Sequence, residues 1–197
     1  MGTDAIQARW LGEAMTARYS VLVWPTIEYG YYPAFIAYPG SVTLSRPSFE
    51  AQLNDILGGL RNHTDAHMLV LNTGISTIAP IDETVSRYAL CTAVHVNQGT
   101  QLRRTAKSVC HQRHGGHGDE AETSIMLAIA PDTVRMSRAS DWDKPVGRGP
   151  LSREPASATY TPQGVWGAPS EATSSKGHAL IASMLKDIDD VYRQLEN

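Results

Sequence analysis

The strongest constraint on the fold is the alternation of short apolar runs with stretches whose apolar residues recur every three or four positions. Residues 21–24 and 67–72 are apolar runs of the length that buried strands have, and residues 41–44 form a further β-like run. Helical spacing occurs before, between and after these runs. This order predicts an α/β sandwich whose sheet is largely parallel.

The segments with helical spacing define the remaining expected elements. Helices are expected over residues 3–15, 45–60, 80–94 and 181–195. The last helix is the clearest, because its apolar residues form one stripe opposite charged ones. Residues 101–109 are mixed and basic, and we expect a third strand or a sheet edge there. Residues 136–169, rich in Pro, Gly, Ser and Arg, are expected to wrap irregularly around a single domain spanning residues 1–197.

Composition excludes several classes of partner and location. With 42% hydrophobic and 19% charged residues, the chain has the make-up of an ordinary globular protein. A net charge of −3 offers no basic surface for nucleic acid or an anionic membrane. No stretch reaches the roughly 18 apolar residues of a membrane span. The two cysteines, Cys91 and Cys110, form neither a disulfide framework nor a metal motif, which favours the reducing cytoplasm.

Histidines and carboxylates concentrate in one stretch of the sequence. Residues 117–124 read HGDEAETS, and His111 and His114 precede them in a glycine-rich loop. Imidazoles and carboxylates at this density are what metal binding or proton transfer requires. A second stretch, residues 29–38, contains four tyrosines and Phe35, which favours either a subunit interface or a wall that stacks on a ligand.

Four segments, in the same order along the chain, resemble the motifs of the creatininase (creatinine amidohydrolase) family. The residues that carry the resemblance are Gly2-Thr3-Asp4, then Tyr29-Gly30 and Tyr38 to Leu44, then His117, Glu122, Thr123 and Ser124 with Pro131, Asp132 and Val134, and finally Gly164 to Pro169 with Ala172, Thr173, Lys176 and Gly177. The resemblance therefore covers nearly the whole sequence.

The resemblance implies a three-layer α/β/α domain, often assembled as a homohexamer, that opens C–N bonds of small amides with two divalent metal ions. Asp4 would be the carboxylate that bridges the metals, and Glu122 a terminal ligand. His117 would be the acid/base that gives a proton to the leaving nitrogen. The metal would be zinc or manganese. Aromatic residues expected to line the pocket for a small-molecule substrate are Tyr31, Tyr32, Phe35 and Trp166.

The sequence departs from the family pattern at the expected metal ligands. The chain starts at Met1, two residues before Thr3-Asp4, so the family's first strand and its Glu-x-His ligands are expected to be missing. Gly74 and Phe35 stand where the family has histidines. With only Asp4 and Glu122 matching ligands, at most one metal ion is expected. Three nearby residues could supplement this pair, namely His114, Asp119 and Glu120.

Three functions remain open from the sequence. The first is a diverged creatininase-type enzyme that acts on a small amide or cyclic amide through His117 and Glu122, with an incomplete metal site. The second is a metal-free enzyme on the same scaffold that performs proton transfer, dehydration or cyclisation. The third is a non-catalytic subunit that assembles with itself or with an intact paralogue, as a homo-oligomer or a hetero-oligomer.

Overall fold

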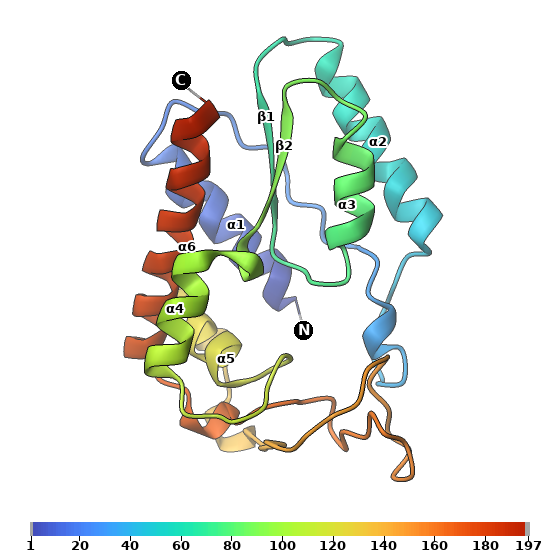
Figure 1. The fold of residues 1–197 in the computed structure, drawn as a ribbon, viewed down its shortest axis with the longest axis vertical. Coiled ribbons are helices and arrows are strands. Elements are labelled where there is room, and N and C mark those ends of the chain that lie inside the picture. The colour runs from blue at the N-terminus through green and yellow to red at the C-terminus, as the bar shows by residue number, and fades with distance from the viewer. Residues whose placement is uncertain (1, 196–197) are drawn as a thin grey trace.

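The structure, a computed structural model, describes residues 2–195 (Figure 1). Two parallel strands, β1 (Met68–Asn72) and β2 (Cys91–His95), lie between two groups of helices. One face of the strands is covered by α2 (Arg46–Arg61) and α3 (Ile78–Val85). The other face is covered by α1 (Thr3–Thr16), α4 (Thr100–Val109), α5 (Glu120–Ile129) and α6 (Ser174–Leu195). Short 3-10 helices span Pro33–Phe35, Val96–Gln98, Pro131–Thr133, Met136–Arg138 and Pro169–Glu171.

The alternation of side chains along β1 explains the three layers. Leu69 and Leu71 pack against the core formed by α1, α4, α5 and α6, whereas Met68 and Val70 pack against α2 and α3. Successive strand residues point to opposite faces, so a strand with four consecutive apolar residues, Met68 to Leu71, has to be covered on both. The predicted α/β/α fold with a parallel sheet is therefore confirmed, although the sheet of the described residues contains only these two strands.

The helices α5 and α6 pack closely because one of them carries a glycine at the crossing point. A Cβ atom on Gly177 would lie 1.8 Å from the carbonyl oxygen of Ser124, so no other residue fits there without displacing a helix. The buried Ser124 hydroxyl also accepts a hydrogen bond from the Thr173 backbone N–H at the start of α6. These contacts give the C-terminal residues of the family pattern a structural role.

The helices expected over residues 3–15, 45–60 and 181–195 and the strand over 67–72 are confirmed. Two other expected strands are wrong. Residues 21–24 form no strand, and Leu22 is 84% exposed, because no neighbouring strand among the described residues pairs with them. Residues 41–44 form a loop in which the Thr43 hydroxyl, rather than a backbone carbonyl, accepts the hydrogen bond from the Tyr32 N–H.

The helix expected over residues 80–94 is only partly correct, because α3 ends at Val85 and residues 91–95 form β2. A turn separates the two elements, and in it Leu90 has a φ of 54°. Arg61, at the end of α2, donates hydrogen bonds to the carbonyl oxygens of Ala89 and Leu90 and so stabilises this turn. Apolar spacing could not reveal a turn that depends on a side chain from another helix.

Residues 101–109, expected as a strand or sheet edge, instead form α4. The Asp187 carboxylate on α6 accepts hydrogen bonds from the backbone N–H groups of Gln101 and Leu102, each at 2.9 Å. It therefore does the work of an N-cap residue from a distant part of the chain. The buried Leu102 then anchors the amphipathic helix in the core.

Residues 139–168 contain no helix or strand and run along one end of the molecule (Figure 1, orange). Their contacts connect them to the loop that follows α1. The Leu151 N–H donates to the Ala34 carbonyl oxygen at 2.8 Å, and the Tyr38 hydroxyl donates to the Thr161 carbonyl oxygen at 2.7 Å. Between residues 2 and 195, no helix combines the length and the apolar character needed to cross a bilayer.

Candidate active site

Asp4 lies in the first turn of α1, where the helix dipole favours a negative charge. The turn after β1 is tied to this position, because the Thr73 hydroxyl donates a 2.9 Å hydrogen bond to the Asp4 backbone carbonyl. Gly74, in the same turn, faces the carboxylate: a Cβ atom at residue 74 would lie 3.3 Å from Asp4 Oδ2. The position where the family pattern has a histidine therefore lies beside Asp4 but carries no side chain.

The ring of Tyr32 occupies the space beside Gly74. A Cβ atom at residue 74 would meet Tyr32 Cε1 at 3.0 Å, and one at Gly30 would meet Tyr32 Cε2 at 2.8 Å. Glycine at both positions therefore lets the ring lie this close. Burial, reinforced by the negative charge of Asp4, raises the pKa of Tyr32 to about 12. The phenol thus stays protonated at neutral pH and is available as a hydrogen-bond donor.

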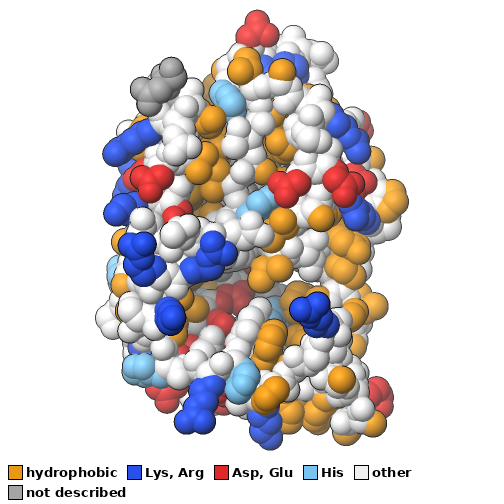
Figure 2. Space-filling view, in the orientation of Figure 1, with side chains coloured by type: hydrophobic (Ala, Val, Ile, Leu, Met, Phe, Trp, Pro, Cys, Tyr) orange, Lys and Arg blue, Asp and Glu red, His pale blue; other side chains and the backbone are white. Residues whose placement is uncertain are grey.

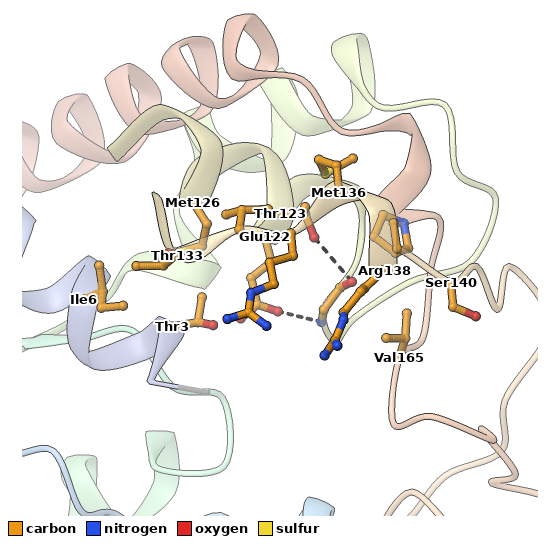
Figure 3. Close-up of a pocket in the computed structure, with 15 residues that line it drawn as sticks. Thr3, Ile6, Glu122, Thr123, Met126, Thr133, Met136, Arg138, Ser140 and Val165 are labelled. Carbon is orange, nitrogen blue, oxygen red and sulfur yellow. Dashed lines mark hydrogen bonds between the residues drawn. The ribbon is translucent and has the colours of Figure 1, made fainter. Parts of the chain in front are cut away.

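Glu122 lies in the first turn of α5 and turns its carboxylate back toward the preceding loop. Its Oε2 atom accepts a 2.6 Å hydrogen bond from the backbone N–H of Gly118 (Figure 3). Gly118 has a φ of 57°, a left-handed conformation that glycine adopts without strain. Burial, followed by the charge of Asp4, raises the pKa of Glu122 to about 7, and burial raises the pKa of Asp4 to about 6. The two carboxylates are therefore close enough to affect each other.

His117 is held in the loop before α5 by backbone and ring contacts. Its backbone pairs with that of Trp166 in an isolated antiparallel bridge, with a 2.8 Å hydrogen bond from Trp166 N–H to the His117 carbonyl. Its imidazole stacks on the Phe35 ring with centroids 3.8 Å apart and planes 23° apart. Burial lowers the pKa of His117 to about 4, so the imidazole is neutral at neutral pH.

These side chains line one cavity of about 280 Å³. Figure 2 shows a hollow in the lower half of this face of the molecule, with acidic and histidine side chains in it. The members already described are Asp4, Tyr32, Phe35, His117 and Glu122. The cavity thus combines two carboxylates of raised pKa with a neutral imidazole and a protonated phenol. A carboxyl group with a pKa near 7 can both take up and release a proton at neutral pH.

A divalent metal ion would need more donors than the described residues bring together. Among residues 2–195, no group of three or more His, Cys, Asp and Glu side chains is arranged to hold a metal. Asp4 and Glu122 supply two hard oxygen donors, whereas catalytic zinc sites usually have three protein ligands. His117 lines the same cavity but stacks on Phe35. This donor set does not by itself fit a bound metal ion.

The three residues named as supplementary ligands all have other partners. Asp119 caps α5, accepting from the Glu122 N–H with one oxygen and from the Gln112 side chain with the other. Glu120 is fully buried and forms a 2.6 Å ion pair with Lys176. His114 donates its backbone N–H to Asp143 Oδ1 and has its Nδ1 atom 3.0 Å from the same oxygen. Of these residues, only Asp119 lines the cavity.

The aromatic residues expected to bind substrate divide into two groups. Tyr32 and Phe35 line the cavity. Tyr31 packs instead against the core of α2 and α3, and Trp166 lies over Gly116 while its indole N–H donates to the Lys144 carbonyl. Sequence reasoning missed several lining residues because no local pattern marks them. These include Thr73, Asn97 and Arg103.

Comparison with known proteins identifies similar sequences and folds. A family model described as creatininase (creatinine amidohydrolase) matches residues 1–191. The search of curated proteins gave no match. Among solved structures, a manganese creatininase aligns with a TM-score of 0.80 at 20% identity, covering 98% of this chain and 83% of the other.

Two further solved structures share the fold. A mutant creatininase complexed with creatine aligns with a TM-score of 0.77 at 20% identity, covering 98% of this chain and 84% of its own. A structure described as creatinine amidohydrolase (creatininase) aligns with the same TM-score and identity, covering 98% and 83%. At this level of identity, these structures establish the common fold and leave the chemistry to be argued from the residues present.

Proposed function

The chain belongs to the creatininase family, and on that premise we propose that it hydrolyses the C–N bond of a small amide or cyclic amide. The observation that carries the proposal is the environment of Glu122. Its carboxyl group has a pKa of about 7, and it lines one cavity with Asp4 and a neutral His117. Perturbed carboxyl groups that share a cavity with a second titratable group are characteristic of acid–base sites.

Glu122 is the proton carrier in this proposal. Its carboxylate takes a proton from water as the water oxygen bonds to the amide carbon, and the carbonyl electrons move to oxygen. When the C–N bond breaks, the same carboxyl group gives its proton to the leaving nitrogen. Because the pKa of His117 is about 4, very little imidazolium exists at neutral pH, and we assign this proton delivery to Glu122 instead.

Neutral donors complete the proposed machinery. The protonated phenol of Tyr32 and the neutral imidazole of His117 line the same cavity as Glu122. Either group can donate a hydrogen bond to the carbonyl oxygen as negative charge develops on it. Asp4 raises the pKa of Glu122 through like-charge repulsion, which favours proton uptake near neutral pH. No step is assigned to a metal ion, since the described donors do not fit one.

The test is turnover of creatinine and of a panel of small cyclic and N-formyl amides by purified protein, followed as release of amine or acid. We expect Glu122→Gln to reduce kcat by about 10²–10⁴-fold, the usual contribution of general acid–base catalysis. Glu13→Gln, on the exposed face of α1, removes the same charge outside the cavity and should leave kcat unchanged. Equal kcat for Glu122→Gln and wild type would refute the proposal.

Metal dependence is measured in the same assay. Zinc or manganese is added in one arm, and a chelator removes bound metal in the other. The two arms distinguish a one-metal hydrolase from a metal-free enzyme that uses the same residues. A chelator-sensitive activity would mean that a metal ion is needed and that Asp4 and Glu122 bind it together with donors from outside the described arrangement. An activity that survives chelation supports the acid–base scheme, and proton transfer, dehydration or cyclisation by the same groups is then distinguished by the products formed.

A non-catalytic role in an oligomer is favoured by one separate observation. Several large apolar side chains before α2 are exposed, namely Leu22, Val23, Trp24, Tyr29, Ile36 and Val42. Exposed apolar side chains gathered in one part of the chain are typical of surfaces covered by another subunit. Light scattering coupled to size-exclusion chromatography tests this role. A stable monomer that turns over no substrate would refute both the non-catalytic subunit and the hydrolase.

A further inference from the structure

A second cavity, of about 400 Å³, shares Glu122 with the first (Figure 3). Its walls come from α1, from the start of α5 and from residues 133–140. Apolar side chains from three elements contribute, namely Ile6, Met126 and Val165, and hydroxyl groups of Thr3, Thr123 and Ser140 stand among them. A molecule that reacts at Glu122 therefore has room to extend into this second cavity.

Two arginines give the second cavity its charge. Arg135 and Arg138 lie on one turn, joined by a 2.9 Å hydrogen bond from the Arg138 backbone N–H to the Arg135 carbonyl. Figure 3 shows the Arg138 side chain directed toward the open part of the cavity, on the opposite side from Ile6 and Thr3. Glu122 is the one acidic residue in the described lining, so the two guanidinium groups outnumber the carboxylates.

Four arginines of the described residues have side-chain partners, whereas the exposed Arg135 and Arg138, like Arg148 and Arg153, have none. Arg9, Arg18 and Arg46 each form an ion pair with a carboxylate, and Arg61 binds four carbonyl oxygens. Within residues 2–195, neither Arg135 nor Arg138 forms a side-chain hydrogen bond or ion pair. Two guanidinium groups that line one cavity and have no other partner are free to donate paired hydrogen bonds to a carboxylate or phosphate.

We infer that Arg135 and Arg138 bind an oxyanion, a carboxylate or phosphate carried by the substrate, while the scissile amide lies at Glu122. The inference rests on the proposed function for the position of the amide, but not for the binding of the anion. The apolar side chains between the two ends then contact the part of the substrate that joins them. The substrate class is an amide with an anionic group, in contrast to a small neutral amide.

Binding of unreactive probes tests this without any turnover. The probes are N-acetylglycine, its neutral amide N-acetylglycinamide, and phenyl phosphate, titrated calorimetrically at pH 7.5 and low ionic strength. We expect at least one anionic probe to bind wild type tenfold or more tightly than the neutral amide, and to weaken with added salt. The anionic probe with the larger arginine-dependent affinity identifies the oxyanion as carboxylate or phosphate.

The decisive variant is Arg135→Gln/Arg138→Gln, and its matched control is Arg148→Gln/Arg153→Gln. Both pairs come from the same part of the chain and are exposed, but the control pair lies outside the cavity. The first variant should lose the tenfold preference for the anionic probe, and the control should keep it. Arg138→Glu alone should abolish the preference, which provides a second variant if the double one folds poorly.

The outcomes separate the two proposals. Equal preference in wild type and the double variant, or equal loss in the control, would overturn the oxyanion site whether or not the protein hydrolyses amides. Arginine-dependent binding without turnover of any amide would uphold the oxyanion site and refute the proposed hydrolysis. Turnover of neutral amides with a kcat/KM unaffected by the arginine variants would uphold hydrolysis alone.

Discussion

Glu120 and Glu122 lie two residues apart on α5, yet their carboxylates have opposite environments. Glu120 is fully buried, but Lys176 Nζ lies 2.6 Å from one oxygen, and the backbone N–H groups of His111 and Gln112 donate to the other. Burial acts to raise the pKa of Glu120, and these three donors outweigh it, so the pKa lies below its usual value.

Glu122 accepts fewer hydrogen bonds than Glu120, and no ion pair joins it to a side chain of the described residues. It accepts a single backbone hydrogen bond, from Gly118, and the charge with the largest effect on its pKa is the carboxylate of Asp4. Its pKa rises to about 7 as a result. Burial alone therefore does not make a reactive carboxylate. The direction of the pKa shift depends on whether a cation and enough hydrogen-bond donors contact the buried carboxylate. In α5, Glu120 has both, through Lys176 and two backbone N–H groups.

The largest effect on stability should come from breaking the compensated pair. Lys176→Met leaves the Glu120 carboxylate buried without its cation, and we expect the free energy of unfolding to fall by about 3–5 kcal/mol. Chemical denaturation followed by circular dichroism measures it. Lys186→Met, on the exposed side of the same helix, is the control and should change stability little. A Lys176→Met protein as stable as the control would mean that Glu120 does not depend on its partner.

Replacing Glu122 should have the opposite effect on stability to breaking the Glu120–Lys176 pair. A folded-state pKa of about 7, above the 4.5 of an unperturbed glutamate, means that Glu122 favours folding below about pH 4.5 and that this contribution is lost as the pH rises through 7. Replacing Glu122 by Gln removes this loss, so the stability of Glu122→Gln relative to wild type should increase by about 2 kcal/mol between pH 5 and pH 8. Denaturation at four pH values measures it. A difference that does not change with pH would contradict the raised pKa.

The Asp4→Asn variant tests how much the negative charge of Asp4 contributes to the raised pKa of Glu122. Removing the neighbouring negative charge should lower the pKa of Glu122 by roughly 1 unit while burial keeps it above its usual value. Carboxyl-carbon NMR titration of Glu122 reads this directly. Glu13→Gln, which removes a carboxylate on the exposed face of α1, should leave the titration unchanged. An unchanged pKa in Asp4→Asn would mean that the charge of Asp4 does not contribute to the raised pKa of Glu122.

The smallest effect concerns the neutral histidine beside this pair. Phe35→Leu removes the stacked ring and lets water approach, so the pKa of His117 should rise from about 4 toward 6.5 by a fraction of a unit. The titration of the imidazole Cε1 proton by NMR measures this rise. His178, exposed on α6, serves as an internal reference in the same spectra. A fall in the His117 pKa would show that the ring does not contribute to its burial.

Much of the fold could be predicted because local patterns carried the necessary information. The stripe of α6, the cap and proline that open α2, and the apolar run from Met68 to Leu71 in β1 each correspond to one local rule. The failures share a different cause. The helix α4 depends on Asp187 and the turn before β2 depends on Arg61, and both side chains come from distant parts of the chain. No window of neighbouring residues contains such contacts.

The candidate site shows the same division. Family motifs in the sequence identified Asp4, His117 and Glu122, and the structure places all three around one cavity. The sequence could not separate Glu120 from Glu122, because both are acidic residues at the start of one helix. It also gave no signal for Arg135 and Arg138, whose proposed role depends on the cavity that they line.

The α/β class, the order of the principal helices and the membership of the creatininase family follow from the amino-acid sequence, because they depend on periodicity and on motifs in register. Which of the two buried carboxylates has a cation and hydrogen-bond donors that offset its burial follows from the three-dimensional contacts alone. That outcome depends on Lys176 reaching Glu120 and on Asp4 approaching Glu122 from opposite ends of the chain. Electrostatic energies of buried groups depend on distances across the fold, and sequence spacing does not contain those distances.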